Sequence, residues 1–136
     1  MSTMERILRL MADRKASDIY LSAHAPAQIR INGQCLPINA QLLPPEAPVS
    51  LLSEILPATR IDELKRTGEL NTAVALDGAG NYRVSAMRQR GSYAVVVRHI
   101  PSTIPAFDSL NLPSILKTLI MEKRGLILMV GATGAG

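Results

Sequence analysis

Three strand-like segments follow one another directly in ELNTAVALDGAGNYRVSAMRQRGSYAVVVRHI, residues 69–100. Apolar residues alternate with polar ones or run almost continuously, and two Gly-containing turns divide the segments. Short segments of this kind, bounded by Gly, Asn and Asp, are typical of antiparallel strands. Residues 69–76, 81–89 and 93–100 are therefore predicted to form a three-stranded meander.

Three more strands are predicted ahead of the meander, over residues 16–22, 28–31 and 34–38. Asn32-Gly33 joins the second of these to the third. This dipeptide strongly favours a two-residue hairpin turn, because both of its residues tolerate the positive φ that the turn requires. The N-terminal part of the chain thus contributes an antiparallel ribbon to the sheet.

Helices are predicted over residues 3–15, from Pro44 to the break at Pro57, and over residues 58–67. Their apolar residues recur at spacings of three and four, which gives each helix one buried stripe. Residues 1–100 are therefore predicted to form an α+β domain, with an antiparallel sheet of about six strands and flanking helices on one side.

A change in composition marks the end of this domain. Pro101–Pro105 contains two prolines and two hydroxyl residues and is predicted to be a linker. Residues 106–136 would then begin a second domain, with a helix over residues 113–122 and a buried strand over residues 126–130.

The predicted strand at 126–130 leads into Gly131-Ala132-Thr133-Gly134-Ala135-Gly136. A phosphate-binding loop has the form G-x-x-x-x-G-K-[ST], follows a strand, and surrounds the phosphates with backbone N–H groups. Gly131 and Gly136 have the spacing of the two motif glycines, but no Lys and Ser or Thr follow them in this sequence. We interpret the six residues as a partial Walker A loop that binds nucleotide. The alternative is a Gly/Ala tail without a binding function.

Arg83 and Arg98 lie inside predicted strands. A strand arginine most often projects into solvent, and the residues alone favour that interpretation. The planar guanidinium is also suited to bind a phosphate at a distance from its main loop. No metal site is predicted, because His24 and His99 lack metal-ligand spacing. Cys35, the only cysteine, is expected to be a small buried side chain.

The composition limits the possible partners of the chain. The net charge of +4 is mild and is spread over 136 residues, which is typical of a solvated surface and gives no indication of nucleic-acid binding. No apolar run reaches the roughly 18 residues that a membrane span needs. The absence of a disulfide pair fits a reducing compartment. We therefore expect a cytoplasmic protein without direct membrane insertion.

The chain as a whole resembles the type II/IV secretion ATPases, and among them the pilus-retraction motors of the PilT/PilU family. Ala132 stands where the PilT branch usually has Pro, which favours the PilU branch. The resemblance runs over essentially the whole chain and is carried by five segments, namely residues 16–22, residues 30–33, residues 82–87, residues 98–101, and residues 123–126 leading into the Gly-rich loop.

This resemblance implies a PAS-like N-terminal domain, a linker and a RecA-like ATPase domain, in a hexameric motor that hydrolyses ATP with Mg²⁺ to power type IV pilus retraction and twitching motility. It also implies that Arg83 and Arg98 contact the nucleotide phosphates from the N-terminal domain. The implied partners are identical subunits, a platform protein of the pilus in the inner membrane and a related retraction ATPase. The motor would lie at the cytoplasmic side of that membrane.

Some family features are absent or altered in this sequence. Tyr20, Tyr82 and Met87 replace residues that the family usually has at these positions, His at the first and Phe at the other two. The Walker Lys, the acidic boxes and the His box are absent, so the 136-residue chain alone is not expected to hydrolyse ATP. The alternatives are a pilus-assembly or type II secretion ATPase, or a stand-alone PAS-like sensory or adaptor module.

Overall fold

The computed structural model of the protein describes residues 1–101 and 103–131. Contacts between residues divide the chain into two compact units, Met1–Ser102 (unit 1) and Thr103–Gly136 (unit 2).

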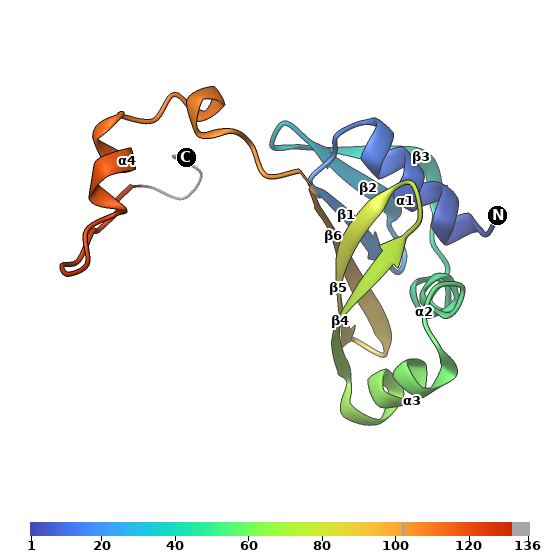
Figure 1. The fold of residues 1–136 in the computed structure, drawn as a ribbon. Helices are drawn as coiled ribbons and strands as arrows, with labels where there is room; N and C mark the ends of the chain where they lie inside the picture. The colour runs from blue at the N-terminus through green and yellow to red at the C-terminus, as the bar shows by residue number, and fades with distance from the viewer. Residues whose placement is uncertain (102, 132–136) are drawn as a thin grey trace. The chain divides into compact units, whose positions relative to one another are not determined.

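Unit 1 contains a single six-stranded antiparallel sheet (Figure 1). Its strands lie in the order β3-β2-β1-β6-β5-β4, so that β1 and β6 pair at the centre and join the N-terminal ribbon to the meander. The α+β sheet predicted from the sequence is confirmed. The strand bounds are β1 Asp18–Ser22, β2 Pro26–Ile31, β3 Gln34–Leu42, β4 Glu69–Leu76, β5 Gly80–Gln89 and β6 Ser92–Ile100.

Three helices lie on one face of this sheet: α1 (Thr3–Asp13), α2 (Ala47–Ser53) and α3 (Ala58–Thr67) (Figure 1). The opposite face of the sheet carries no helix of unit 1 and is called the open face below. The core lies between helices and sheet, and its fully buried side chains include Met4, Leu8, Met11, Ile19, Leu21, Leu52, Leu64, Val84 and Val97.

Local sequence explains how the helices and turns form. The Ser2 side chain accepts a hydrogen bond from the Glu5 amide and caps α1. Gly68 ends α3 with a φ of 84°, a conformation that costs glycine little. Asn32 and Gly33 both have positive φ, as the predicted hairpin turn requires.

Tyr82 connects the sheet to α1. Its ring is fully buried. Its hydroxyl lies 2.9 Å from the Leu8 carbonyl oxygen of α1 and 3.0 Å from that of Ala79, so it can donate to either. The ring also contacts the His99 ring at a centroid distance of 5.2 Å. Burial raises the pKa of the Tyr82 phenol above its ordinary value.

The raised pKa predicts a loss of stability at alkaline pH. Unfolded Tyr82 releases its proton near pH 10, while the folded protein retains it, so the free energy of unfolding should fall as the pH rises above about 10. One such group contributes up to about 1.4 kcal/mol per pH unit. Urea unfolding between pH 8 and 11 measures this slope, which should be smaller in Tyr82→Phe. Equal slopes in the two proteins would contradict the assignment to Tyr82.

The first three strands differ from expectation at the sheet edge. β3 continues to Leu42, past the predicted end at residue 38, because β2 begins at Pro26 and pairs with Leu42 beyond a register shift between Pro26 and Gln28. Cys35 lies on this edge strand and is exposed, so the prediction of a buried cysteine is wrong. An edge strand has a neighbour on one side only, which leaves its side chains more accessible than those at the sheet centre.

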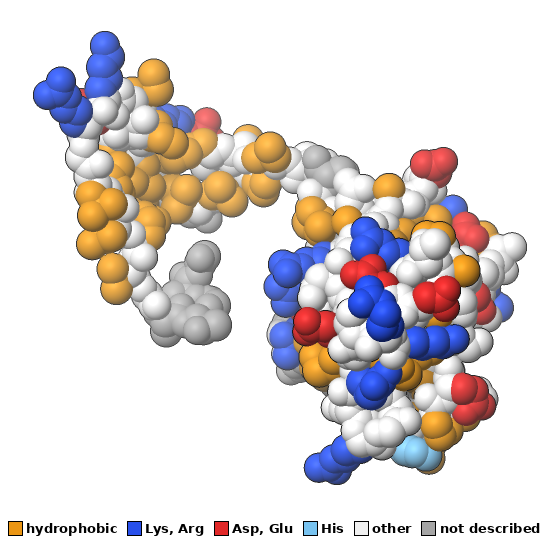
Figure 2. Space-filling model, turned by 90° about the horizontal axis from the view of Figure 1, so that it is seen from below, with side chains coloured by type: hydrophobic (Ala, Val, Ile, Leu, Met, Phe, Trp, Pro, Cys, Tyr) orange, Lys and Arg blue, Asp and Glu red, His pale blue; other side chains and the backbone are white. Residues whose placement is uncertain are grey.

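The described part of unit 2 contains little regular secondary structure. It contains a 3₁₀ turn at Phe107–Leu110 and α4 at Ile115–Leu119, which is shorter than the predicted helix. The strand expected over residues 126–130 is not formed. A single strand cannot satisfy its backbone without a paired neighbour, and none lies in residues 103–131. Apolar side chains of this segment are exposed instead (Figure 2).

In the part of the chain that the structure describes, no helix is long and apolar enough to cross a membrane.

Candidate functional site

Four charged residues lie side by side across the centre of the open face. Asp18 of β1 is opposite Arg30 of β2 on one side and opposite Arg98 of β6 on the other, and Arg98 is opposite Arg83 of β5. We call Arg30, Asp18, Arg98 and Arg83 the charged row. On each strand, the residue that belongs to the charged row lies next to residues that point into the core, because successive side chains of a strand point to opposite faces.

Core packing holds the row on the open face. In the next row of paired residues, Ile19 is opposite Val97, and Val97 is opposite Val84. All three are fully buried under the helices. A shift of the pairing by one residue would exchange this apolar row with the charged row, which strongly specifies the observed register.

Arg98 is attached to the sheet by an ion pair. Its Nε donates to Asp18 Oδ1 at 2.8 Å, and its side chain is still 64% exposed. Asp18 itself is only 2% exposed. The second carboxylate oxygen of Asp18 accepts a hydrogen bond from the Ser17 hydroxyl at 2.9 Å. Arg98 is thus held at one nitrogen while most of its guanidinium remains open to solvent.

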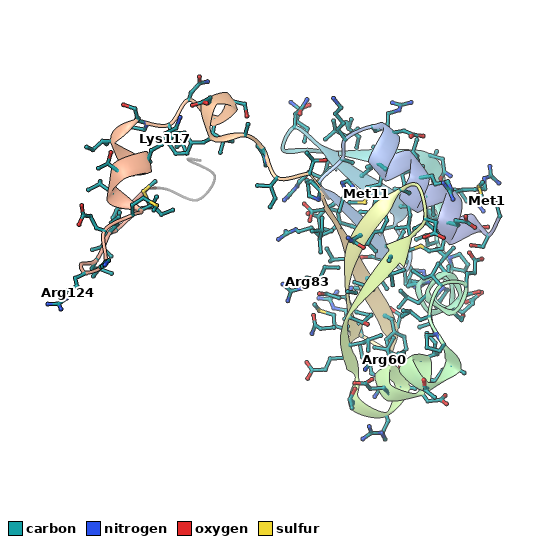
Figure 3. All side chains as sticks on the ribbon, in the orientation of Figure 1. Met1, Met11, Arg60, Arg83, Lys117 and Arg124 are labelled. Carbon is teal, nitrogen blue, oxygen red and sulfur yellow. The ribbon has the colours of Figure 1, made fainter. Side chains whose placement is uncertain are left out.

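Arg83 differs from Arg98 in its contacts. It is exposed, and within residues 1–101 and 103–131 no carboxylate lies within salt-bridge distance of it. Figure 3 shows its side chain extending from the sheet on the side away from α1, α2 and α3. Like charges directly opposite each other on neighbouring strands repel, so the pairing of Arg83 with Arg98 is unfavourable unless an anion lies near both.

Arg30 packs more closely against the sheet. Its Nη1 lies 3.8 Å from Asp18 Oδ2, and its guanidinium carbon lies 5.5 Å from the centre of the Tyr20 ring. The neighbouring Cys35 side chain and then the Tyr20 phenol raise the pKa of Arg30. Burial, followed by the charge of Asp18, raises the pKa of Tyr20. The row carries a net positive charge and is suited to bind an anion.

The sequence-predicted site residues divide into two groups. Arg83 and Arg98 lie next to each other on the open face of unit 1. Gly131 belongs to unit 2 and is exposed in an irregular segment, and Ala132, Thr133, Gly134, Ala135 and Gly136 lie outside the described residues.

Sequence reasoning missed the participation of Asp18 and Arg30. The sequence around Asp18 indicates only a local structural role in the first strand. Its partner Arg98 is 80 positions away, and no local pattern in the sequence indicates their contact. A usable signal was the charged residue itself: Asp18 lies in a predicted strand beside the apolar residues Ile19 and Leu21, and a buried carboxylate requires a cationic or hydrogen-bonding partner.

Comparison with known proteins gives relatives along almost the whole chain. The type IV pilus ATPase PilU of Pseudomonas aeruginosa is 36% identical over 132 residues, 97% of this chain and 35% of PilU. The uncharacterised protein YggR of Escherichia coli is 34% identical over 98% of this chain and 40% of YggR. The type IV pilus retraction ATPase PilT of Pseudomonas aeruginosa is 29% identical over 96% of this chain and 38% of PilT.

The chain belongs to the type II/IV secretion ATPase superfamily. It corresponds to the N-terminal region of these proteins and spans about 35–40% of the length of the curated relatives it matches. No protein-family model matches the chain.

Solved structures agree with this membership of the secretion ATPase superfamily. A crystal structure of the pilus retraction motor PilT with bound ADP matches with a TM-score of 0.76 and 32% identity, over 98% of this chain and 39% of that one. The ATPase DotB of Legionella pneumophila matches with a TM-score of 0.77 and 26% identity, over 96% of this chain and 38% of DotB. The six-stranded sheet with its flanking helices is thus a fold shared within the superfamily.

Proposed function

We propose that this chain is the N-terminal part of a hexameric ATP-hydrolysing motor that powers type IV pilus retraction. Two of the relatives are named as type IV pilus ATPases, and the PilT structure contains ADP. In this proposal the protein acts in the cytoplasm, at the inner membrane, through a platform protein of the pilus and a related retraction ATPase.

The observation that carries the proposal is the pairing of Arg83 with Arg98 on the open face. Two guanidinium groups on adjacent strands repel each other, and the phosphates of a nucleotide would relieve that repulsion. Both side chains are exposed and can reach a ligand outside unit 1. The charged row therefore fits a polyphosphate.

In this proposal the two parts of the chain contribute different groups to the nucleotide site. Residues 1–100 form the domain that contributes Arg83 and Arg98, residues 101–105 form the linker, and residues 106–136 begin a RecA-like ATPase domain. In that second domain Gly131–Gly136 would contribute backbone N–H groups to the phosphates, as the first part of a Walker A loop.

The arginines can act on ATP in two ways. Their donors hold the phosphate oxygens in place, and their charge stabilises the negative charge that develops when the terminal phosphate leaves. The described residues contain no group of three or more His, Cys, Asp or Glu that could hold a metal ion.

A related function within the superfamily is the second candidate. DotB matches the fold as well as PilT does, with TM-scores of 0.77 and 0.76, but at 26% rather than 32% identity. The backbone therefore does not separate a pilus motor from another ATPase of this superfamily, and the sequence favours the pilus motor. Restoration of twitching by this protein in a retraction-deficient strain would separate the two.

Substitution of the two arginines tests the proposal in the full-length protein. Arg83→Ala and Arg98→Ala should each lower the rate of ATP hydrolysis about 10- to 150-fold, since a hydrogen bond to a charged group contributes about 1.5–3 kcal/mol. Steady-state phosphate release measures this effect. Thermal unfolding would check that both variants remain folded.

Arg60→Ala is the matched control. Arg60 is an exposed arginine on α3, where it pairs with Glu63 at 2.7 Å (Figure 3). Its replacement removes the same charge from the helical side of unit 1 and should leave turnover unchanged. Wild-type turnover in both folded arginine variants of the charged row would refute their assigned role.

A further inference from the structure

Asp18 is the one acidic residue in the charged row and is almost fully buried on a face that is otherwise open. A buried carboxylate loses its hydration and requires compensation by hydrogen bonds or opposite charge. Asp18 has two arginine neighbours, yet their contacts differ: Arg98 Nε is at 2.8 Å and Arg30 Nη1 is at 3.8 Å. The stronger of the two contacts therefore belongs to Arg98.

The geometry of the Asp18–Arg98 contact leaves Arg98 available to a ligand. The carboxylate occupies Nε, while neither Nη atom of Arg98 has a hydrogen-bond partner within residues 1–101 and 103–131. These Nη atoms carry the planar pair of donors that suits a phosphate. A long arginine side chain held at Nε also loses part of its rotational freedom before a ligand arrives, which lowers the entropic cost of binding.

Asp18 is itself fixed by the strands on both sides. The Ser17 hydroxyl donates to its Oδ2, the Ser17 amide donates to the Arg30 carbonyl oxygen, and the His99 amide donates to the Ser17 carbonyl oxygen. Its position is thus determined by backbone pairing at the centre of the sheet. By contrast, Arg83 has no carboxylate partner in the described chain and keeps its side-chain freedom.

We infer that Asp18 is a positioning residue that orients Arg98 through Nε and presents its Nη donors to a phosphate, while Arg83 acts as an independent, freely moving cation. This inference rests on the proposed function of the charged row in nucleotide binding. It predicts that Asp18 affects nucleotide affinity only through Arg98.

A double-mutant cycle in the full-length protein tests this dependence. The probe is adenylyl imidodiphosphate, a non-hydrolysable ATP analogue, titrated in the presence of magnesium. Asp18→Ala should weaken its binding about 5- to 10-fold, and Asp18→Asn, which keeps an oxygen acceptor, should weaken it less. In an Arg98→Ala background Asp18→Ala should change the affinity by less than about twofold. In an Arg83→Ala background it should again weaken binding about 5- to 10-fold.

The outcomes separate the inference from the proposed function. An undiminished effect of Asp18→Ala in the Arg98→Ala background overturns the inference, because Asp18 would then act on the fold as a whole. Wild-type affinity of folded Arg98→Ala instead overturns the role of Arg98 in the proposed function.

A second measurement on the unsubstituted 136-residue chain covers the case in which Asp18→Ala does not fold. Nitrogen-15 NMR spectra resolve the Nε–H groups of arginine side chains. Exchange of the Arg98 Nε proton with water should be at least about tenfold slower than that of Arg83, because only the former is hydrogen-bonded. Equal exchange rates would overturn the inference.

Discussion

Val97→Asp should lower the free energy of unfolding of unit 1 by at least about 4 kcal/mol, while Val96→Asp should lower it by about 1 kcal/mol or less. Val97 is fully buried at the centre of β6, between Ile19 of β1 and Val84 of β5. An isolated carboxylate among these apolar side chains costs at least about 4 kcal/mol, a large share of the roughly 5–15 kcal/mol that stabilises a small domain.

Val96 is the matched control in the same strand. It is half-buried on the open face, opposite Tyr20 and Ser85, where a carboxylate stays in contact with water. Its replacement by Asp should cost about 1 kcal/mol or less. Circular dichroism during urea titration measures both variants. A folded Val97→Asp beside an unfolded Val96→Asp would mean that the register of β6 is shifted by one residue.

Tyr82→Ala is expected to have the second-largest effect on stability. The variant leaves a cavity beneath α1 and removes the hydroxyl bonded to the Leu8 and Ala79 carbonyl oxygens. Truncation of a large buried aromatic residue typically costs about 3–5 kcal/mol. Urea unfolding at neutral pH, where the phenol of the wild-type protein is neutral, measures the difference.

Tyr93→Ala provides the comparison for this variant. Tyr93 is half-buried near the turn between β5 and β6, and its hydroxyl accepts hydrogen bonds from Arg88. Its loss should cost less than half as much as that of Tyr82, because less apolar surface returns to water. Equal costs for the two tyrosines would contradict the central place given to Tyr82 in the core.

The elements best predicted from the sequence are those with strong local signals. β4 was predicted with its observed bounds, and α3 likewise, since Pro57 and Gly68 mark the two ends of that helix. The hairpin at Asn32-Gly33 has the expected positive φ values. In each case residues close in sequence decide the conformation.

Predictions failed where distant parts of the chain decide the outcome. The exposure of Cys35 follows from the edge position of β3, which depends on the strand order of the whole sheet. The strand over residues 126–130 lacks a neighbour in the described part of unit 2. The role of Asp18 depends on pairing across the sheet centre. The assignment of Gly131–Gly136 as a Walker A loop stays a prediction.

The pairing of β1 with β6 has a consequence for how the chain folds. This pairing at the sheet centre brings together residues 80 positions apart, Asp18 and Arg98, whereas the hairpins on either side form from neighbouring segments. Closing so long a loop early costs much entropy, so the two halves should form first and join late. During synthesis the first ribbon must wait until β6 has left the ribosome. Until then its β1 edge is unprotected and prone to pair with other chains.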